Sequence, residues 1–475
     1  MKNRRDSFRE ECGLMGVWNH HEAANLAYLG LYAQQHRGQE GAGVVSLDRQ
    51  SKVMSVHRGL GLVSDIFSTF DFSALPGDVS IGHVRYTTAG GHRLANVQPF
   101  QAEIAMGKVA IAHNGNLINA DKLREQLIAQ GAIFSATSDT EIVLHLLARA
   151  PKHLPVIEGV IKSLQDLRGA FSLLILLEDR LIAVRDPAGF RPLVIGSLHD
   201  GVVIASETCA LDLIGAEYVR DVQPGEMVEI TSQGSIRSYF PFPHSRESAC
   251  IFEYVYFARP DSQIFGRNVY TIRKQMGIEL AREFPVTADL VVPVPDSGVP
   301  AALGFSQESK IPLEMGLIRN HYVGRTFIEP KQSIRDFGVK IKLNPISEML
   351  EGKSIVIVDD SIVRGTTSRK LVKMIRAAGA REVHMRISSP PTTDPCYYGI
   401  DTPSKEELIA SHKSAEEIAE FIGVDSLAYL TIDGLYRAVD KAGNGGRGKF
   451  CDACFTGDYP IGTPNDHATR QGRLF

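Results

Sequence analysis

The stretch SIVIVDDSIVRGTT (354–367) constrains the fold of the second half of the chain more than any other. It begins with an apolar run of the kind that is buried on both faces of a parallel sheet. Two carboxylates, Asp359 and Asp360, follow, and a loop of small residues then leads into a helical pattern. Backbone N–H groups of such a loop bind phosphate, and the carboxylates can take ribose hydroxyls and Mg²⁺. The stretch lacks the lysine spacing of a P-loop, and it predicts a doubly wound α/β domain with its ligand at the carboxyl ends of the strands.

A second junction of strand and turn supports this prediction. The stretch VVPVPDSGVPAALG (291–304) turns at Asp296, Ser297 and Gly298, and the glycine lets a ligand approach the backbone closely. This turn follows a predicted strand at 288–295, just as the first loop follows a predicted strand at 353–360. The helical patterns that alternate with these strands cover 268–284, 365–379 and 404–422.

The first half, up to about residue 230, consists mainly of short β-branched runs separated by glycine-rich turns. Many short strands with few helices between them predict stacked antiparallel sheets rather than a parallel α/β unit. Helices are predicted at 121–130 and 138–147, and Ser138 and Glu141 predict a capping box for the second. A proline- and aromatic-rich passage, 239–250, is interpreted as the connection between two domains. The predicted strands cover 41–48, 52–59, 79–88, 108–117, 170–178, 180–187 and 201–208.

The beginning of the chain, NRRDSFREECGLMGVW (3–18), changes from charged to apolar at Cys12. The charged segment has no apolar core, so it is not a secretory signal. A cysteine that becomes the first residue of a chain can use its own terminal amine as a base. One interpretation is therefore a removable pro-segment, residues 1–11, cut between Glu11 and Cys12. On these residues alone, a loose terminus followed by a core cysteine is the simpler alternative.

The composition limits the classes of function. The 475 residues carry a net charge of −4, with 44% apolar and 22% charged residues. A chain of this length exceeds one ordinary core, so at least two domains are expected. The lack of a basic excess argues against a nucleic-acid surface, and no apolar run is long enough to cross a bilayer. We therefore expect a cytoplasmic protein that binds neither nucleic acid nor membranes.

Six cysteines are too few for a disulfide scaffold in a chain of this length, so thiols, metal ligands or nucleophiles are expected. Cys451 and Cys454, in the stretch CDAC, join Cys250 and Cys396 as a candidate four-thiolate set for [4Fe–4S] or zinc. The spacing does not distinguish iron from zinc. Cys209 begins an apolar helical stretch and is expected in the core.

The 354–367 stretch closely resembles the phosphoribosyl-pyrophosphate-binding motif of type I phosphoribosyltransferases. The resemblance implies that the turn formed by Asp296, Ser297 and Gly298 holds pyrophosphate. It also implies that Ser297, Asp359 and Asp360 coordinate Mg²⁺. The residues implied to bind phosphoribosyl pyrophosphate are Asp359, Asp360, Ser361, Arg364, Gly365, Thr366 and Thr367.

The stretches CGLMGVWNH (12–20) and QQHRGQEGAGVV (34–45) resemble the class II, N-terminal-nucleophile glutamine amidotransferases. The mature chain of that family begins with the catalytic cysteine, and its fold is an αββα sandwich. The resemblance thus implies that Cys12 is the nucleophile and that residues 1–11 are removed.

The rest of that family's glutamine pocket follows in order. GHVRYTTAG (82–90) contains Arg85, whose guanidinium fork suits the glutamine α-carboxylate. Asp139, in SDTE, matches the family's ligand for the glutamine α-amino group. In HNGNL (113–117), Asn114 and the Gly115 N–H are implied to form the oxyanion hole.

Together the two halves resemble the glutamine phosphoribosylpyrophosphate amidotransferase family from Cys12 to about Tyr459. The resemblance implies a pro-segment (1–11), a glutaminase domain (12–240) and a phosphoribosyltransferase domain with a cysteine-bearing tail (241–475). It implies conversion of 5-phosphoribosyl 1-pyrophosphate and glutamine to 5-phosphoribosylamine, glutamate and pyrophosphate, which commits the pathway to purine nucleotides. One branch of the family carries both a pro-segment and a [4Fe–4S] cluster, which favours iron at the four cysteines. Inhibition by purine nucleotides and a homotetramer are implied as well.

Two rival interpretations share parts of this pattern. A catalytically retired, nucleotide-sensing regulatory protein could use the second fold, but the retained Cys12, Arg85, Asn114 and Asp139 argue against it. A glutamine-dependent aminotransferase acting on fructose 6-phosphate would share the first domain, yet the 354–367 motif has no place there.

The mixed-charge stretch 324–343 is expected to fold over bound phosphoribosyl pyrophosphate.

Overall fold

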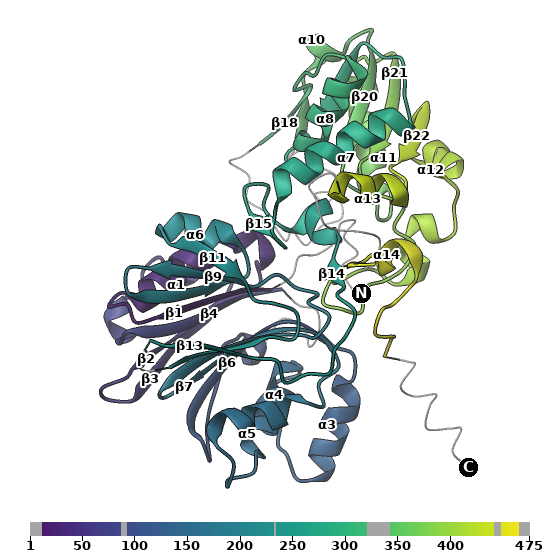
Figure 1. Cartoon of the computed structure of the whole chain (residues 1–475). Helices are drawn as coiled ribbons and strands as arrows, with labels where there is room; N and C mark the ends of the chain where they lie inside the picture. The colour runs from purple at the N-terminus through teal and green to yellow at the C-terminus, as the bar shows by residue number, and fades with distance from the viewer. Residues whose placement is uncertain (1–11, 87–92, 232–233, 321–342, 441–447, 465–475) are drawn as a thin grey trace, which may run out of the picture.

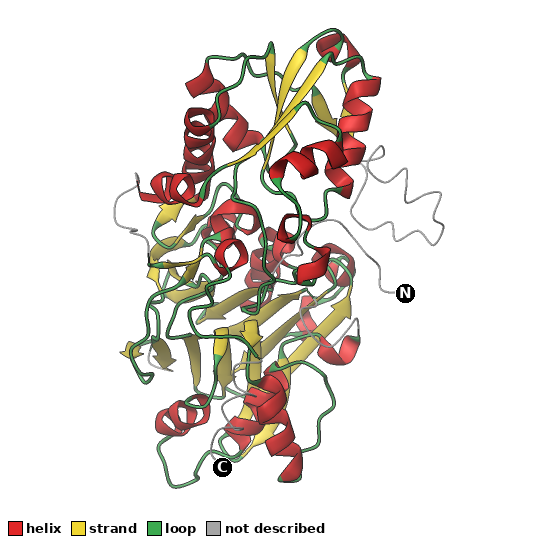
Figure 2. Ribbon diagram, turned by 90° about the vertical axis from the view of Figure 1, so that its right-hand side faces the viewer, coloured by secondary structure: helices red, strands yellow, loops and turns green. Residues whose placement is uncertain are grey.

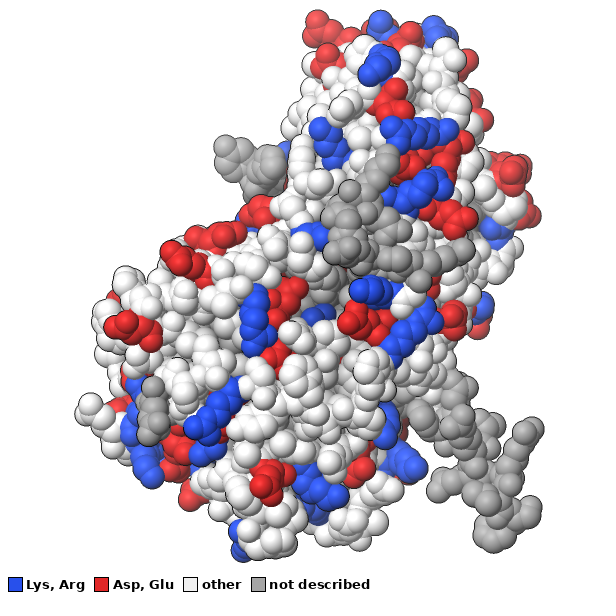
Figure 3. Space-filling view, viewed as in Figure 1, with Lys and Arg blue, Asp and Glu red and all other residues white. Residues whose placement is uncertain are grey.

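A computed structural model describes residues 12–86, 93–231, 234–320, 343–440 and 448–464. They form two lobes (Figure 1), of which the first runs from β1 to β13 and the second from β14 to α14. No helix in these ranges is long and apolar enough to cross a membrane. Acidic and basic side chains are intermixed on the face shown in Figure 3.

Two antiparallel sheets form the first lobe. The strand order in one is β11-β9-β10-β1-β4-β2-β3, and in the other it is β13-β12-β8-β7-β6-β5. The first sheet contains β1 (Gly13–Trp18), β2 (Gly41–Asp48), β3 (Val53–Leu60), β4 (Val79–Arg85), β9 (Val194–Leu198), β10 (Gly201–Ala205) and β11 (Glu217–Asp221). The second contains β5 (Phe100–Ile104), β6 (Gly107–Leu117), β7 (Gly169–Leu177), β8 (Arg180–Arg185), β12 (Met227–Thr231) and β13 (Ile236–Tyr239).

The two sheets pack face to face because apolar residues alternate along their strands. In β1, Leu14 and Trp18 enter the core between the sheets, whereas Met15 and Val17 face the helices outside. The helices α1 (Ala23–Ala33), α2 (Val63–Phe67) and α6 (Thr208–Ile214) cover the first sheet. The second is covered by α3 (Ala120–Ala129), α4 (Thr140–Ala148) and α5 (Val156–Leu164). The predicted αββα sandwich is therefore confirmed.

The second lobe has a parallel sheet with the strand order β17-β20-β21-β22. Alternate residues of β20 face opposite layers, Val356 and Val358 on one side and Ile355 and Ile357 on the other. Helices cover both faces (Figure 2), which confirms the predicted doubly wound α/β arrangement. The strands are β17 (Leu290–Pro293), β20 (Ser354–Asp359), β21 (Glu382–Ile387) and β22 (Ser426–Tyr429). The helices are α7 (Val269–Glu283), α8 (Val299–Ser309) and α13 (Ile432–Asp440) on one face, and α11 (Thr366–Ala377) and α12 (Ala415–Ile422) on the other.

Two local predictions are wrong. The pattern at 404–422 forms two single 3₁₀ turns before α12, which begins only where Ser414 and Glu417 make a capping box. At α4, Glu141 does not complete a box with Ser138, because its carboxylate accepts the N–H groups of Ser135 and Ala136 at 2.8 and 2.7 Å. Glu141 thus stabilises the loop that enters the helix.

Short elements lie between the lobes and around the sheet of the second lobe. The predicted passage 239–250 connects β13 to β14 and is followed by a single π-helical turn, η4 (Glu253–Phe257). The short strands are β14 (Ala249–Cys250), β15 (Gln263–Ile264), β16 (Arg267–Asn268), β18 (Leu317–Arg319), β19 (Leu343–Pro345) and β23 (Phe450–Cys451). The short helices are α10 (Ser347–Leu350) and α14 (Ala453–Thr456).

Candidate active sites

Cys12 lies directly before β1, in the middle of the first sheet. The residue is buried, with 8% of its surface exposed, and its Sγ lies 3.6 Å from the Tyr86 carbonyl oxygen. Burial raises the pKa of the Cys12 thiol to about 11, although the charge of Arg85 acts in the opposite direction. The pairing of Gly13 with Val84 in β4 brings Arg85 beside the cysteine. A thiol in this state needs a base before it can act as a nucleophile.

The second sheet contributes Asn114 and Gly115, near the end of β6. The Asn114 side chain is buried, and its Nδ2 has no hydrogen-bond partner among the described residues. Gly115 has a φ of 145°, and a Cβ atom there would lie 2.1 Å from the Ala170 carbonyl oxygen, so only glycine fits. A buried amide donor without a partner suits an oxyanion that forms only during a reaction.

Asp139 lies beside this strand, immediately before α4. Its carboxylate accepts the Leu117 N–H at 3.0 Å and lies 3.4 Å from Nδ1 of His113. Burial alone would raise the pKa of Asp139, but His113 and the backbone N–H groups hold it below its usual value. Asp139 also interacts electrostatically with Cys12. The site therefore combines a fixed anion, the cysteine and the guanidinium of Arg85, which suits an amino acid with its ammonium and carboxylate groups.

In the second lobe, the two predicted loops lie side by side because β17 and β20 are paired in parallel. A cavity of about 140 Å³ is lined by Ser297 of the first loop and by several predicted residues of the second. Desolvation and the charge of the adjacent Asp360 raise the pKa of Asp359 well above its usual value. The predicted residues of the second loop that line this cavity are Asp359, Asp360, Ser361, Gly365 and Thr367.

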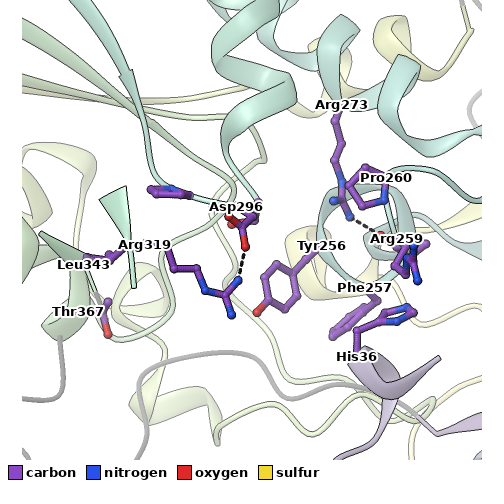
Figure 4. Close-up of a pocket in the computed structure, with 13 residues that line it drawn as sticks. His36, Tyr256, Phe257, Arg259, Pro260, Arg273, Asp296, Arg319, Leu343 and Thr367 are labelled. Carbon is purple, nitrogen blue, oxygen red and sulfur yellow. Dashed lines mark hydrogen bonds and ion pairs between the residues drawn. The ribbon is translucent and has the colours of Figure 1, made fainter. Parts of the chain in front are cut away.

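A larger cavity of about 420 Å³ adjoins it and shares Ser297, Thr367 and Tyr256 (Figure 4). Asp296 forms an ion pair with Arg319 on one wall, and His36 of the first lobe lies on another. Three predicted residues, Gly298, Arg364 and Thr366, line neither cavity. Arg364 instead pairs with Glu407 at 3.2 Å, and Gly298 and Gly365 are the N-cap residues of α8 and α11. Gly298 is closely packed, because a Cβ atom there would lie 2.5 Å from the Val358 carbonyl oxygen.

A buried ionic network that the sequence did not reveal joins the two lobes. Arg37 has 1% exposure, and it pairs with Glu253 at 2.6 Å and also with Glu207. Its Nε donates to the Cys12 carbonyl oxygen at 3.3 Å, while Glu253 begins the η4 turn that carries Tyr256 into the cavities. His36, next to Arg37, pairs with Glu207 at 2.7 Å and lines the larger cavity. A sequence signal for this network was that QQHRGQE (34–40) and FEYVYFARP (252–260) place charged residues next to apolar stretches.

The structure brings the four candidate ligand cysteines together at the junction of the lobes. Cys250 and Cys451 are direct partners in the pairing of β14 with β23, and each interacts electrostatically with Cys396. Burial raises the pKa of Cys250 to about 11 and that of Cys454 well above its usual value. Cys209 lies apart in α6 and is buried, as expected. No three His, Cys, Asp or Glu side chains in the described ranges have the geometry to hold a single ion.

Two predictions fall outside the described residues. These are the pro-segment, 1–11, and the stretch 324–343 apart from Leu343, which begins β19.

Comparison with known proteins assigns a family to each lobe. Residues 85–213 match the family described as "Glutamine amidotransferase domain", and residues 267–389 match "Phosphoribosyl transferase domain". A solved structure of glutamine phosphoribosylpyrophosphate (PRPP) amidotransferase from B. subtilis, complexed with ADP and GMP, superposes with a TM-score of 0.89 at 48% identity. That match covers 95% of this chain and 98% of the other.

Curated relatives agree over almost the whole length. Amidophosphoribosyltransferase 2, chloroplastic, of Arabidopsis thaliana is 53% identical over 98% of this chain and 82% of its own. Amidophosphoribosyltransferase of Rhizobium etli is 54% identical over 96% of this chain and 92% of its own. The corresponding enzyme of Bacillus subtilis is 49% identical over 95% and 94%. The chain belongs to the amidophosphoribosyltransferase family.

Proposed function

We propose that this chain converts glutamine and 5-phosphoribosyl 1-pyrophosphate to 5-phosphoribosylamine, glutamate and pyrophosphate, the step that commits a cell to purine nucleotide synthesis. The observation that carries the proposal is the physical connection of the two sites. Arg37 holds the carbonyl of Cys12, and its neighbour His36 lines the larger cavity of the second lobe. Two adjacent residues thus connect the nucleophile of the first site to the cavity of the second.

The first lobe would act through the thiol of Cys12. Once residues 1–11 are removed, the new α-amine takes the thiol proton, and the sulfur attacks the side-chain amide carbon of glutamine. Asn114 and the Gly115 N–H donate hydrogen bonds to the oxyanion, while Arg85 and Asp139 hold the α-carboxylate and α-ammonium groups. The amine returns its proton to the departing ammonia, and water later releases glutamate from the thioester.

The second lobe would hold the acceptor. The 365–367 loop at the N-terminus of α11 donates N–H groups to the 5-phosphate, and Asp359 and Asp360 accept the ribose hydroxyls. The turn at 296–298 would hold the pyrophosphate. Ammonia attacks C1 of the ribose, the bond from C1 to the pyrophosphate oxygen breaks, and pyrophosphate leaves. Exclusion of water from the site prevents hydrolysis of the acceptor.

The carboxylates of this site fit a Mg²⁺ ion. Magnesium is bound by one or two carboxylates together with substrate phosphates rather than by a complete protein cage. Desolvation and the Asp360 charge raise the pKa of Asp359, so a cation there would remove a repulsion between the two groups. Asp359, Asp360 and Ser297 would hold the ion, and it would supply positive charge against the leaving pyrophosphate.

An assay with purified protein tests the proposal. Glutamine, phosphoribosyl pyrophosphate and Mg²⁺ should give glutamate and pyrophosphate in equal amounts, and omission of either substrate should stop both products. A nucleotide-sensing protein without activity would bind phosphoribosyl pyrophosphate but release neither product. A sugar-phosphate aminotransferase would accept fructose 6-phosphate in its place.

We further propose that the chain matures by cleavage between Glu11 and Cys12. Without a free amine beside it, the buried Cys12 thiol keeps a pKa of about 11 and is almost entirely protonated at neutral pH. The intact mass of the purified active protein should therefore lack residues 1–11. Full glutamine-dependent activity in a chain that retains all eleven residues would contradict this proposal.

The four junction cysteines are proposed to hold a [4Fe–4S] cluster. The residues fit such a group, because four thiols gather, with Cys250, Cys451 and Cys454 buried and Cys396 partly buried, and metal binding deprotonates thiols. The resemblance to the branch of the family that carries a [4Fe–4S] cluster together with a pro-segment favours iron over a single zinc ion. The cluster would tie the tail to the second lobe. Protein purified without oxygen should be brown, with iron and sulfide in equal amounts, and stoichiometric zinc in a colourless active protein would overturn the proposal.

Inhibition by purine nucleotides, a homotetramer and a cytoplasmic location are proposed as well. Binding of purine nucleotides as inhibitors is supported by the B. subtilis relative, whose solved structure is a complex with ADP and GMP. A homotetramer is checked by the mass in solution. A cytoplasmic location is checked by fractionation, since several relatives carry names marked chloroplastic.

A further inference from the structure

A short segment of the second lobe, residues 396–399, lies directly against the strand that carries the oxyanion residues. Asn116, two residues beyond Asn114, donates from its Nδ2 to the Tyr397 carbonyl oxygen at 2.9 Å. The next carbonyl, that of Tyr398, accepts Nε and Nη2 of the buried Arg191 at 3.1 and 2.6 Å. Consecutive carbonyls of one lobe are therefore fixed by side chains of the other.

The contact continues at the backbone. Gly399 has a φ of 110°, and a Cβ atom there would lie 3.1 Å from both the carbonyl carbon and the Cα of Gly115. The Tyr398 ring stacks on Phe190 of the first lobe with centroids 4.4 Å apart. One buried apolar cluster spans this junction and contains Ile118, Ala170, Ala188, Phe190, Tyr398, Cys451 and Ala453.

Strand β6 needs support at this point. Its neighbour β5 pairs with it only as far as Ile111, whereas β7 pairs with it to Leu117. Asn114 and Gly115 thus lie in the stretch of β6 that has a strand neighbour on one side only. The Tyr397 carbonyl holds this stretch through Asn116, and the close approach of Gly399 limits how far it can shift.

The other end of the segment belongs to the four-cysteine site. Cys396 Sγ accepts the Tyr398 N–H at 3.3 Å, and the Cys396 N–H donates to Thr402 Oγ1 at 2.7 Å. Cys451 shares the apolar cluster with Tyr398. A change at the cysteines would therefore move the same backbone that touches Gly115.

We propose that residues 397–399 position the oxyanion strand and that Asn116 is the residue of the first lobe that binds this segment. This inference rests on the proposed glutaminase activity and extends it. An oxyanion hole acts through donors that are fixed in advance, and a misplacement of about 1 Å can cost about a hundredfold in rate. The four-cysteine site thereby influences glutamine hydrolysis without contacting glutamine.

The test uses the full-length matured enzyme with Asn116→Asp, which keeps the shape of the side chain but replaces the donor with a carboxylate, and with Asn116→Ala. With phosphoribosyl pyrophosphate and Mg²⁺ present, we expect kcat for glutamine hydrolysis to fall at least about tenfold, with KM for glutamine changed less than about twofold. Alkylation of Cys12 by iodoacetamide builds no oxyanion, so its rate should match that of the wild type. Ammonia-dependent synthesis should also match, which shows that each variant is folded.

Asn119→Ala is the matched control. The Asn119 Nδ2 donates to the Asp166 carbonyl at 2.9 Å, the same bond within one lobe, and its loss should leave kcat unchanged. Wild-type kcat in both Asn116 variants would overturn the positioning role, and so would an equal loss of Cys12 alkylation, which would indicate a disrupted pocket. A wild-type enzyme that does not hydrolyse glutamine would instead refute the proposed function.

Discussion

The Cys12→Ala variant should lose glutamine-dependent formation of phosphoribosylamine by about 10⁴-fold or more, because no other group can form the thioester. Ammonia-dependent formation should stay within about twofold of the wild type, since free ammonia replaces the first reaction. Cys12 lines neither cavity of the second lobe, and alanine removes only the sulfur atom from a buried position. The two rates are measured on one preparation as pyrophosphate release with glutamine and with ammonium chloride.

Cys209→Ala is the control for this variant. Cys209 is also buried, and its Sγ lies 3.9 Å from the Ala33 carbonyl oxygen and 3.8 Å from Glu207. Loss of that sulfur should leave both rates within about twofold. A Cys12→Ala enzyme that still uses glutamine would show that another residue is the nucleophile. Loss of both rates in a folded protein would show that the lobes do not divide the reaction.

Seven strands of the first lobe were predicted from the sequence, whereas β1, β5, β9, β11, β12 and β13 were not. The stretch 41–48 coincides with β2, and 108–117 differs from β6 by one residue. Both combine β-branched residues with glycine-bounded ends. The prediction of one helix at 404–422 was wrong in its first half. The apolar residues there fit a helical period, but Ser414 caps a helix that begins only after it.

The predicted site residues share another property. Asp359 ends β20 and Ser297 lies in the turn after β17, so a parallel sheet places them at one edge whatever the rest of the chain does. Arg37 and Glu253 are separated by more than two hundred residues, and nothing local indicates that they meet. Their pairing depends on how the lobes pack. The same is true of Asn116 and Tyr397, so every contact that joins the two sites emerged only from the structure.

Arg37→Met should destabilise the protein by about 3 to 5 kcal/mol at neutral pH, because two buried carboxylates lose their shared positive partner. Glu253 accepts Nη1 and Nη2 of Arg37 at 3.0 and 2.6 Å, and both it and Glu207 have fully buried side chains. Methionine fills much of the volume of the arginine stem, so the effect reports charge rather than a cavity. The loss appears as a lower thermal unfolding midpoint. Arg376→Met is the control, since Arg376 pairs with Asp425 at the surface, where an ion pair contributes about 1 kcal/mol or less.

The pH dependence separates this account from a simple packing defect. In the wild type, burial raises the pKa of Glu207, but His36 and Arg37 more than offset it and hold it below 4.5. Ionised Glu207 therefore stabilises the fold above the pKa of the unfolded chain, and this stability is lost only as pH falls through the lower folded value. Without Arg37, burial raises the pKa of the Glu207 carboxyl. Acid that protonates Glu207 therefore destabilises the variant less than it destabilises the wild type. The gap between the two midpoints should be widest at pH 7 to 8 and should narrow toward about pH 5. A gap that is the same at every pH would mean that Arg37 acts through its volume and not through its charge.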